Sequence, residues 1–162
     1  MFAGKGLTEY TIPDSANITT ITSLYGEDFQ TLIFSSTIKS CTGGIYGMEK
    51  LSKIVLNEGL KEIKGNFNLK SLTELVLPST LTKIDCSGMD PGDTPFGWET
   101  LKTLTFTSDT PPNLPPDNYG TGGFTGAEGF QIYVPKGKLA AYQEAYKAYE
   151  KYDWYKNMKQ SQ

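Results

Sequence analysis

The sequence LSKIVLNEGLKEI at residues 51–63 returns as LTELVLPSTLTKI at residues 72–84. Every apolar position of the first segment recurs in the second. Self-similarity at a fixed period of about 20 to 30 residues indicates one supersecondary unit that is stacked many times, each copy covering the apolar face of its neighbour. The repeat therefore predicts a solenoid, a class of fold that usually binds rather than catalyses.

Looser copies of the same pattern extend it in both directions. The spacing stays almost constant upstream and lengthens downstream, so that six units begin near residues 7, 29, 51, 72, 101 and 129. At 162 residues the chain is long enough for one domain. We expect residues 1–135 to form the repeat solenoid of a single domain, and the chain to be the C-terminal part of a longer protein.

Each unit predicts one short strand followed by a return crossing. Its Leu-x-Leu segment alternates as a strand does, which sends both leucines inward and the residue between them outward. The second half, Leu60-x-x-Ile63 or Leu81-x-x-Ile84, must carry the chain back across the stack. Gly59 and Pro78 at the start of these halves suit a turn that leaves a strand.

The consensus Leu-x-x-Leu-x-Leu-Pro-x-x-Leu-x-x-Ile resembles the BspA-like class of leucine-rich repeats. Members often end with a Thr-Pro-Pro element, a glycine-rich stretch with a phenylalanine, an Ile-x-Val-Pro strand and a helix with tyrosine and tryptophan. The matching elements here are Thr110-Pro-Pro112, Gly122-Gly-Phe124, Ile132-Tyr-Val-Pro135, Tyr142 and Trp154. The resemblance covers residues 7–155. It implies an α/β-type, right-handed solenoid with a short-stranded parallel sheet, a mostly irregular convex side and a C-terminal capping helix.

Residues 136–157 predict that helix, because tyrosines and Leu139 recur at spacings of three and four with alanines between them. A terminal repeat leaves an apolar flank uncovered, so we interpret residues 136–162 as a capping helix and tail. The alternative is that the tyrosines and Trp154 form an exposed ligand platform.

Composition argues against several functions. The chain has no histidine, which removes Ser-His and Cys-His pairs and imidazole acid–base chemistry. It has a net charge of −3 with scattered lysines, so it offers no basic stripe for nucleic acid. No apolar run approaches the roughly 20 residues that a membrane helix needs. We therefore expect no enzyme, no cofactor, no nucleic-acid binding and no membrane insertion.

The two cysteines are expected to stay unpaired. Cys41 aligns with the inward Ile63 and Ile84, whereas Cys86 lies two units along the stack and two residues past that position. Two strand spacings separate them by roughly 9 to 10 Å, beyond the roughly 7 Å that a disulfide allows between Cα atoms. Cys41 should therefore be a core thiol.

An acidic loop follows the fourth unit. Its carboxylates Asp85, Asp90 and Asp93 could hold calcium through oxygen ligands, but their spacing misses the known loop patterns. Aspartate with glycine and proline is also typical of an exposed turn. We favour the turn and keep calcium as the weaker alternative.

The outward residue of each Leu-x-Leu forms a column across the predicted sheet: Thr11, Ile33, Val55, Val76, Thr105 and Tyr133. Apolar residues exposed on an open sheet and rimmed by polar groups are typical of a protein-binding surface. We predict a binding surface formed by Ile33, Lys53, Val55, Glu74, Val76, Thr105 and Tyr133. The alternative is that β-branched residues stand here only because they favour strands.

The resemblance implies a surface or secreted protein of host-associated bacteria or mucosal protists. It suggests an extracellular or cell-surface, adhesin-like module, favoured as a monomer, that binds a host, neighbouring-cell or matrix protein. A structural spacer without its own ligand is one alternative. A carbohydrate-binding part that uses its long loops is another.

Overall fold

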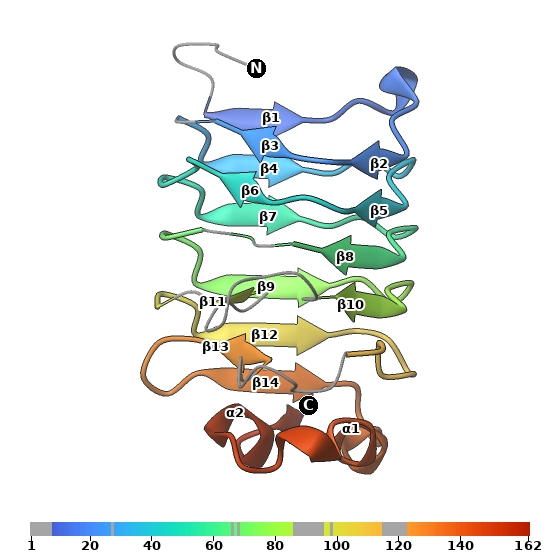
Figure 1. The fold of residues 1–162 in the computed structure, drawn as a ribbon, viewed down its shortest axis with the longest axis vertical. Helices are drawn as coiled ribbons and strands as arrows, with labels where there is room; N and C mark the ends of the chain where they lie inside the picture. Colours follow the sequence, from blue (N-terminus) through green and yellow to red (C-terminus); the bar gives the residue numbers. More distant parts are fainter. Residues whose placement is uncertain are drawn as a thin grey trace.

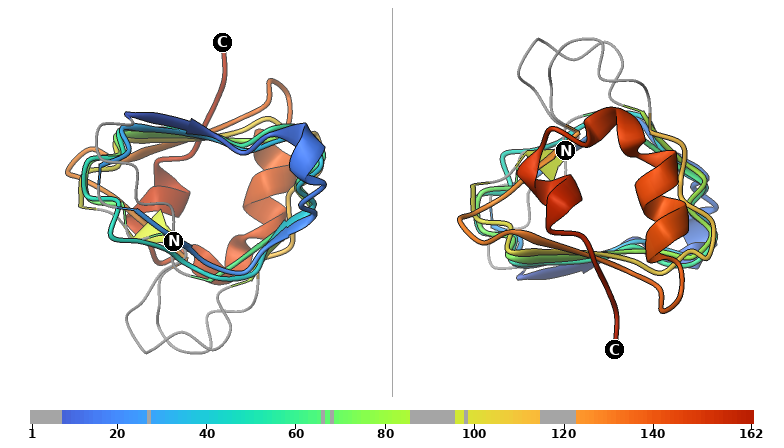
Figure 2. Two further views of the ribbon diagram at one scale, coloured as in Figure 1. Left: turned by 90° about the horizontal axis from the view of Figure 1, so that it is seen from above. Right: turned by 90° about the horizontal axis from the view of Figure 1, so that it is seen from below.

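The computed structural model describes residues 8–26, 28–65, 67, 69–85, 96–97, 99–114 and 123–162. In these residues the chain is mostly strand, arranged in parallel sheets, with few helices. The strands lie one above another along the long axis, and both α-helices of the described residues lie at the C-terminal end (Figure 1). Seen along that axis, successive passages of the chain overlie one another around the same outline (Figure 2). We call each passage a coil.

One side of the stack, which we call the front face, carries the strands predicted from Leu-x-Leu. They form two sheets, one of β1 (Glu9–Thr11), β4 (Thr31–Ile33) and β7 (Lys53–Val55), the other of β9 (Glu74–Leu77), β12 (Thr103–Phe106) and β14 (Gln131–Val134). The second sheet gains a strand that the sequence did not predict, β15 (Lys159–Gln160), beside β14. The pairing is parallel, with Ile33 between Thr11 and Val55 and with Thr105 between Val76 and Tyr133. The predicted register is confirmed on both sides of the break between the sheets.

The opposite side, the back face, is a sheet of β2 (Thr20–Ile21), β5 (Ser40–Cys41), β8 (Glu62–Lys64) and β10 (Lys83–Asp85). Two smaller pairs join β3 (Leu24–Tyr25) to β6 (Ile45–Tyr46) and β11 (Phe96–Gly97) to β13 (Phe124–Thr125). The expectation of a mostly irregular convex side is therefore wrong. Since Ile63 and Ile84 hold the same position in successive units and both point into the core, their backbones reach pairing distance.

The core lies between the two faces and is built from the repeated apolar positions, among them the fully buried Leu32, Leu51, Leu72 and Leu104. Cys41 is a free thiol with a fully buried side chain, as predicted. Burial raises its pKa to about 12, against a small opposing effect of its hydrogen bond to Gly43. Cys86 lies outside the described residues.

The C-terminal segment is not one helix. It breaks into α1 (Leu139–Ala145), the 3₁₀ turn η2 (Lys147–Tyr149) and α2 (Asp153–Lys156), and a second 3₁₀ turn, η1 (Asp14–Ala16), lies near the other end of the stack. The backbone of Tyr152 is extended, with φ −89° and ψ 147°, so the chain bends between η2 and α2. Within the described residues both α-helices lie at this end, and the rest of the described chain is mostly strand.

The tyrosines of this segment close the end of the stack. The hydroxyl of Tyr142 donates to the Ser108 carbonyl at 2.8 Å, and that of Tyr146 donates to the Pro112 carbonyl at 2.8 Å. Both rings pack against Phe106, and Trp154 packs edge-on against Phe124. Because Tyr142, Tyr146 and Trp154 are buried, they form a cap and not an exposed platform.

Candidate functional site

The front face is interrupted between β7 and β9, a break that we call the seam. Across the neighbouring steps the Phe34 N–H donates to the Val55 carbonyl at 2.9 Å, and the Thr103 N–H donates to the Thr73 carbonyl at 3.1 Å. The equivalent bonds at the seam would run from Leu56 N–H to Val76 and from Glu74 N–H to Ser52. Neither forms, and no strand pairing or bridge joins β7 to β9 in the described part of the chain.

Pro78 removes one backbone donor at the end of the seam. At the equivalent position one coil along, Thr107 donates its N–H to the Leu77 carbonyl at 3.3 Å. Proline has no N–H, so Pro78 cannot make the matching bond to Leu56. The same two coils remain paired on the back face through β8 and β10. The opening is therefore local to the front.

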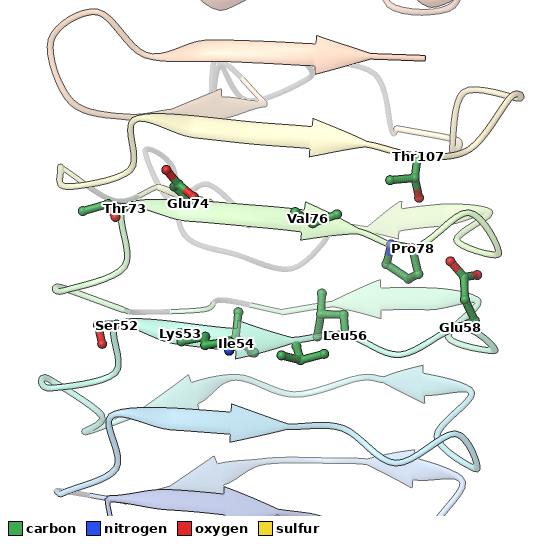
Figure 3. A pocket seen from close by; sticks show the side chains of 11 residues that line it. Ser52, Lys53, Ile54, Leu56, Glu58, Thr73, Glu74, Val76, Pro78 and Thr107 are labelled. Carbon is green, nitrogen blue, oxygen red and sulfur yellow. The ribbon is translucent and has the colours of Figure 1, made fainter. Parts of the chain in front are cut away.

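A hollow of about 550 Å³ lies over the seam (Figure 3). Its floor reaches Ile54 and Leu56, which are each 7% exposed, whereas Leu75 and Leu77 on the other side are each 1% exposed. Val76 stands at the middle of β9 and is 53% exposed. The hollow is lined by Ser52, Lys53, Ile54, Val55, Leu56, Glu58, Thr73, Glu74, Val76, Pro78 and Thr107.

Side chains hold the seam at both ends. At one end the Ser71 hydroxyl donates to the Glu49 carbonyl. At the other, the Glu58 carboxylate accepts from the Ser79 N–H at 3.0 Å, the Ser79 hydroxyl at 2.9 Å and the Thr80 N–H at 3.2 Å. Burial alone would raise the pKa of Glu58, but these hydrogen bonds outweigh it and lower the pKa below its ordinary 4.5. These hydrogen bonds therefore hold the two coils together at both ends of the seam.

Opposite charges face each other across the rim. Lys53 and Glu74 occupy equivalent positions on β7 and β9, both are exposed, and neither side chain has an ion pair or hydrogen bond within the described residues. On the back face, by contrast, Lys83 lies 2.9 Å from Glu62 and 3.0 Å from Asp85. The rim charges at the seam are therefore available to a ligand.

The structure brings four of the predicted site residues together, since Lys53, Val55, Glu74 and Val76 all line the hollow. Ile33, Thr105 and Tyr133 are half-buried on the strands β4, β12 and β14. A binding role for these seven residues stays a prediction. Sequence reasoning missed Glu58. This carboxylate stands in one turn, and Ser79 with Thr80 follows one repeat later in the next turn, which was a usable signal.

The weaker calcium hypothesis meets a competing arrangement. Asp85 is buried and lies 3.0 Å from Lys83 and 4.0 Å from Lys64, so its charge is already balanced. Asp90 and Asp93 lie outside the described residues. Among the residues that are described, no three carboxylates or thiols lie close enough together to hold a metal ion.

None of the described helices is long and apolar enough to cross a membrane. The seam offers an apolar floor, together with two charges and backbone groups that have no partner among the described residues, which suits noncovalent docking. A scan against protein-family models finds no match to the chain, and a search of curated proteins finds none either.

Proposed function

We propose that the stacked coils form a right-handed leucine-rich repeat solenoid of the BspA-like type and act as a non-catalytic, protein-binding module. Three features support the fold: the recurrence of the same apolar positions in each unit, one front strand in each unit, and inward apolar residues in parallel register. The motifs of residues 110–112 and 132–135 support the family.

The hollow at the seam carries the functional proposal. It places the exposed Val76 and the half-buried Val55 above an apolar floor, with Lys53 and Glu74 at the rim. Protein interfaces combine such an apolar centre with a polar rim. Exposed β-branched residues alone would need no ligand, but a break in the sheet beneath them is not explained by strand propensity.

The proposed partner is a surface or matrix protein of a host or neighbouring cell, and the proposed location is extracellular or at the cell surface. Both come from the resemblance to BspA-like proteins. The acidic net charge of −3 and the scattered lysines agree with a protein partner rather than nucleic acid.

The test compares capture of purified matrix and mucosal surface proteins by the immobilised chain and its Val55→Asp/Val76→Asp variant. Two carboxylates buried against a partner without counter-charges should reduce affinity at least about tenfold. Ile18→Asp is the matched control, because Ile18 is also an exposed β-branched residue but lies outside the front face, between η1 and β2.

Circular dichroism and thermal unfolding check that each variant is folded. Unchanged capture by the double variant would refute a binding role for the seam. If even the wild-type chain captures none of these proteins, a structural spacer becomes the better account.

A further inference from the structure

The bond missing between Glu74 and Ser52 leaves a specific pair of groups at the hollow. The N–H of Glu74 is a donor without a backbone acceptor, and the carbonyl of Ser52 receives no backbone donor across the seam within the described part of the chain. Both residues line the hollow. A ligand that displaces water here must return one acceptor and one donor, or it leaves these groups unsatisfied.

A primary carboxamide supplies that combination, since its oxygen accepts and its NH₂ group donates. The rim charges favour a neutral group as well. Lys53 attracts a carboxylate and Glu74 repels it, but a carboxylate has no hydrogen to donate to Glu74 or to the Ser52 carbonyl, and an ammonium group has no acceptor for Lys53 or for the Glu74 N–H. A carboxamide can donate to the first pair and accept from the second.

The next pair of residues along the seam is apolar. Val55 and Val76 follow Lys53 and Glu74 by two positions, and side chains two positions apart in an extended chain lie on one side, about 7 Å from each other. An extended peptide can thus place a carboxamide and an apolar side chain in the hollow together. None of the described residues that line the hollow is an aromatic residue that could stack against a sugar ring, which favours a peptide over a carbohydrate.

From these contacts we infer that the seam binds an extended segment of a partner protein, with a glutamine or asparagine side chain between Ser52 and Glu74 and an apolar residue two positions later over Val55 and Val76. This inference rests on the proposed protein-binding function. It adds the chemistry of the segment that the seam recognises.

The first experiment needs no ligand. Hydrogen exchange followed by NMR should show the Glu74 and Leu56 amides exchanging at least about tenfold faster than the Thr103 and Phe34 amides, which hold the equivalent bonds in paired steps. Equal protection at the four amides would mean that the seam is closed in solution, and the inference would fall.

The second experiment titrates the labelled chain with two capped pentapeptides at millimolar concentration, Thr-Gln-Thr-Val-Thr and its carboxylate counterpart Thr-Glu-Thr-Val-Thr. The glutamine peptide should shift the Glu74 amide resonance and slow its exchange, and the glutamate peptide should bind at least about tenfold more weakly. The same response to both peptides, or none at Glu74, overturns the inference.

Free N-acetylglucosamine is the third probe, because its acetamido group carries a related amide. If it alone shifts the Glu74 resonance, the seam recognises a carbohydrate and the peptide inference is wrong. The two proposals fail separately. Lost capture in the Val55→Asp/Val76→Asp variant with no response to the glutamine peptide leaves the seam as a binding surface and removes only its amide selectivity.

Discussion

The coils that begin near residues 51 and 72 lie against each other on both faces of the stack, but within the described residues their strands pair only on the back face. There, Lys83, Ile84 and Asp85 pair with Glu62, Ile63 and Lys64. On the front, β7 and β9 approach each other without a ladder in the described chain. On both faces the residues that lie opposite each other are the same number of positions apart in the sequence. The length of the repeat therefore does not decide whether two coils pair.

Side chains account for the difference. On the back face Ile63 and Ile84 are fully buried, and Lys83 joins Glu62 and Asp85. Hydrogen bonding to Glu62 and then to Asp85 raises the pKa of Lys83. At the front, Pro78 removes a donor and Val76 stays exposed. The back face therefore holds the coils together, while the front leaves backbone and side chains open to a ligand.

The largest effect should come from the closed face. Ile84→Ala removes a fully buried side chain and should lower the free energy of unfolding by about 2–5 kcal/mol. Val76→Ala, in the same coil but half-exposed, should change it by less than about 1 kcal/mol. Urea denaturation measures both. Equal losses would show that the front contributes as much stability as the back.

Alkaline pH should also weaken the back face through Cys41 on β5. Burial raises the pKa of this thiol from its ordinary 9.0 to about 12, so the folded state keeps the proton that the unfolded chain releases. This stability is complete below pH 9.0 and is lost as the pH rises toward 12, by up to about 1.4 kcal/mol per pH unit.

The control is Cys41→Ala, whose stability should fall less steeply over the same range. Burial also raises the pKa values of Tyr142 and Tyr146, so both proteins lose stability at high pH, and the thiol is measured by the difference between them. Parallel curves for the two proteins would contradict the prediction.

Much of the front face could be predicted from the sequence. Leu75 and Leu77 are buried and Val76 is exposed, as the alternation requires, and the recurring Leu-x-Leu pattern predicted the pairing of Ile33 with Val55 and of Val76 with Thr105. The back face was missed, because a strand of two or three residues such as β5 or β8 has only one inward side chain and is too short for an alternating pattern to be recognised in the sequence.

The periodicity of the apolar side chains could not predict the seam or the bend in the C-terminal segment. The pattern of apolar residues is the same in β7 and β9, and it reports which way side chains point rather than whether backbones bond. Pro78, which has no N–H, was one local signal at the end of the seam. In the tail, tyrosines at helical spacing predicted one helix, but closing the stack requires a bend before α2 so that Trp154 reaches Phe124.

Replacing Glu58 tests how much the hydrogen bonds at one end of the seam stabilise the protein. Glu58→Gln weakens the hydrogen bonds that the carboxylate accepts from Ser79 and Thr80, and should cost about 0.5–1 kcal/mol at neutral pH, since the side chain is exposed. The lowered pKa of Glu58 means that its contribution is present above its ordinary 4.5 and is lost as the pH falls below it.

Urea denaturation of wild type and variant should therefore show a difference at neutral pH that shrinks in acid. A difference that persists at a pH well below 4.5 would mean that the glutamine disturbs the turn in some other way than by losing charge.

The smallest change in stability should come from Pro78→Thr, which gives the open face the residue found at position 107. The new N–H can donate to the Leu56 carbonyl, a gain of about 0.5–1.5 kcal/mol. Loss of proline frees the unfolded chain and costs about 0.4–1 kcal/mol, so the free energy of unfolding should change by less than about 1 kcal/mol.

Hydrogen exchange separates those two opposing effects. If the missing donor holds the seam open, the Glu74 and Leu56 amides of the variant should become as protected as those of Thr103 and Phe34, and the glutamine peptide should lose its binding site. If exchange at Glu74 stays fast, proline is not the cause. The hydrogen bonds from Ser71 to the Glu49 carbonyl and from Ser79 to Glu58 would then set the distance between the strands, and the side chains to change next are those of Ser71 and Glu58.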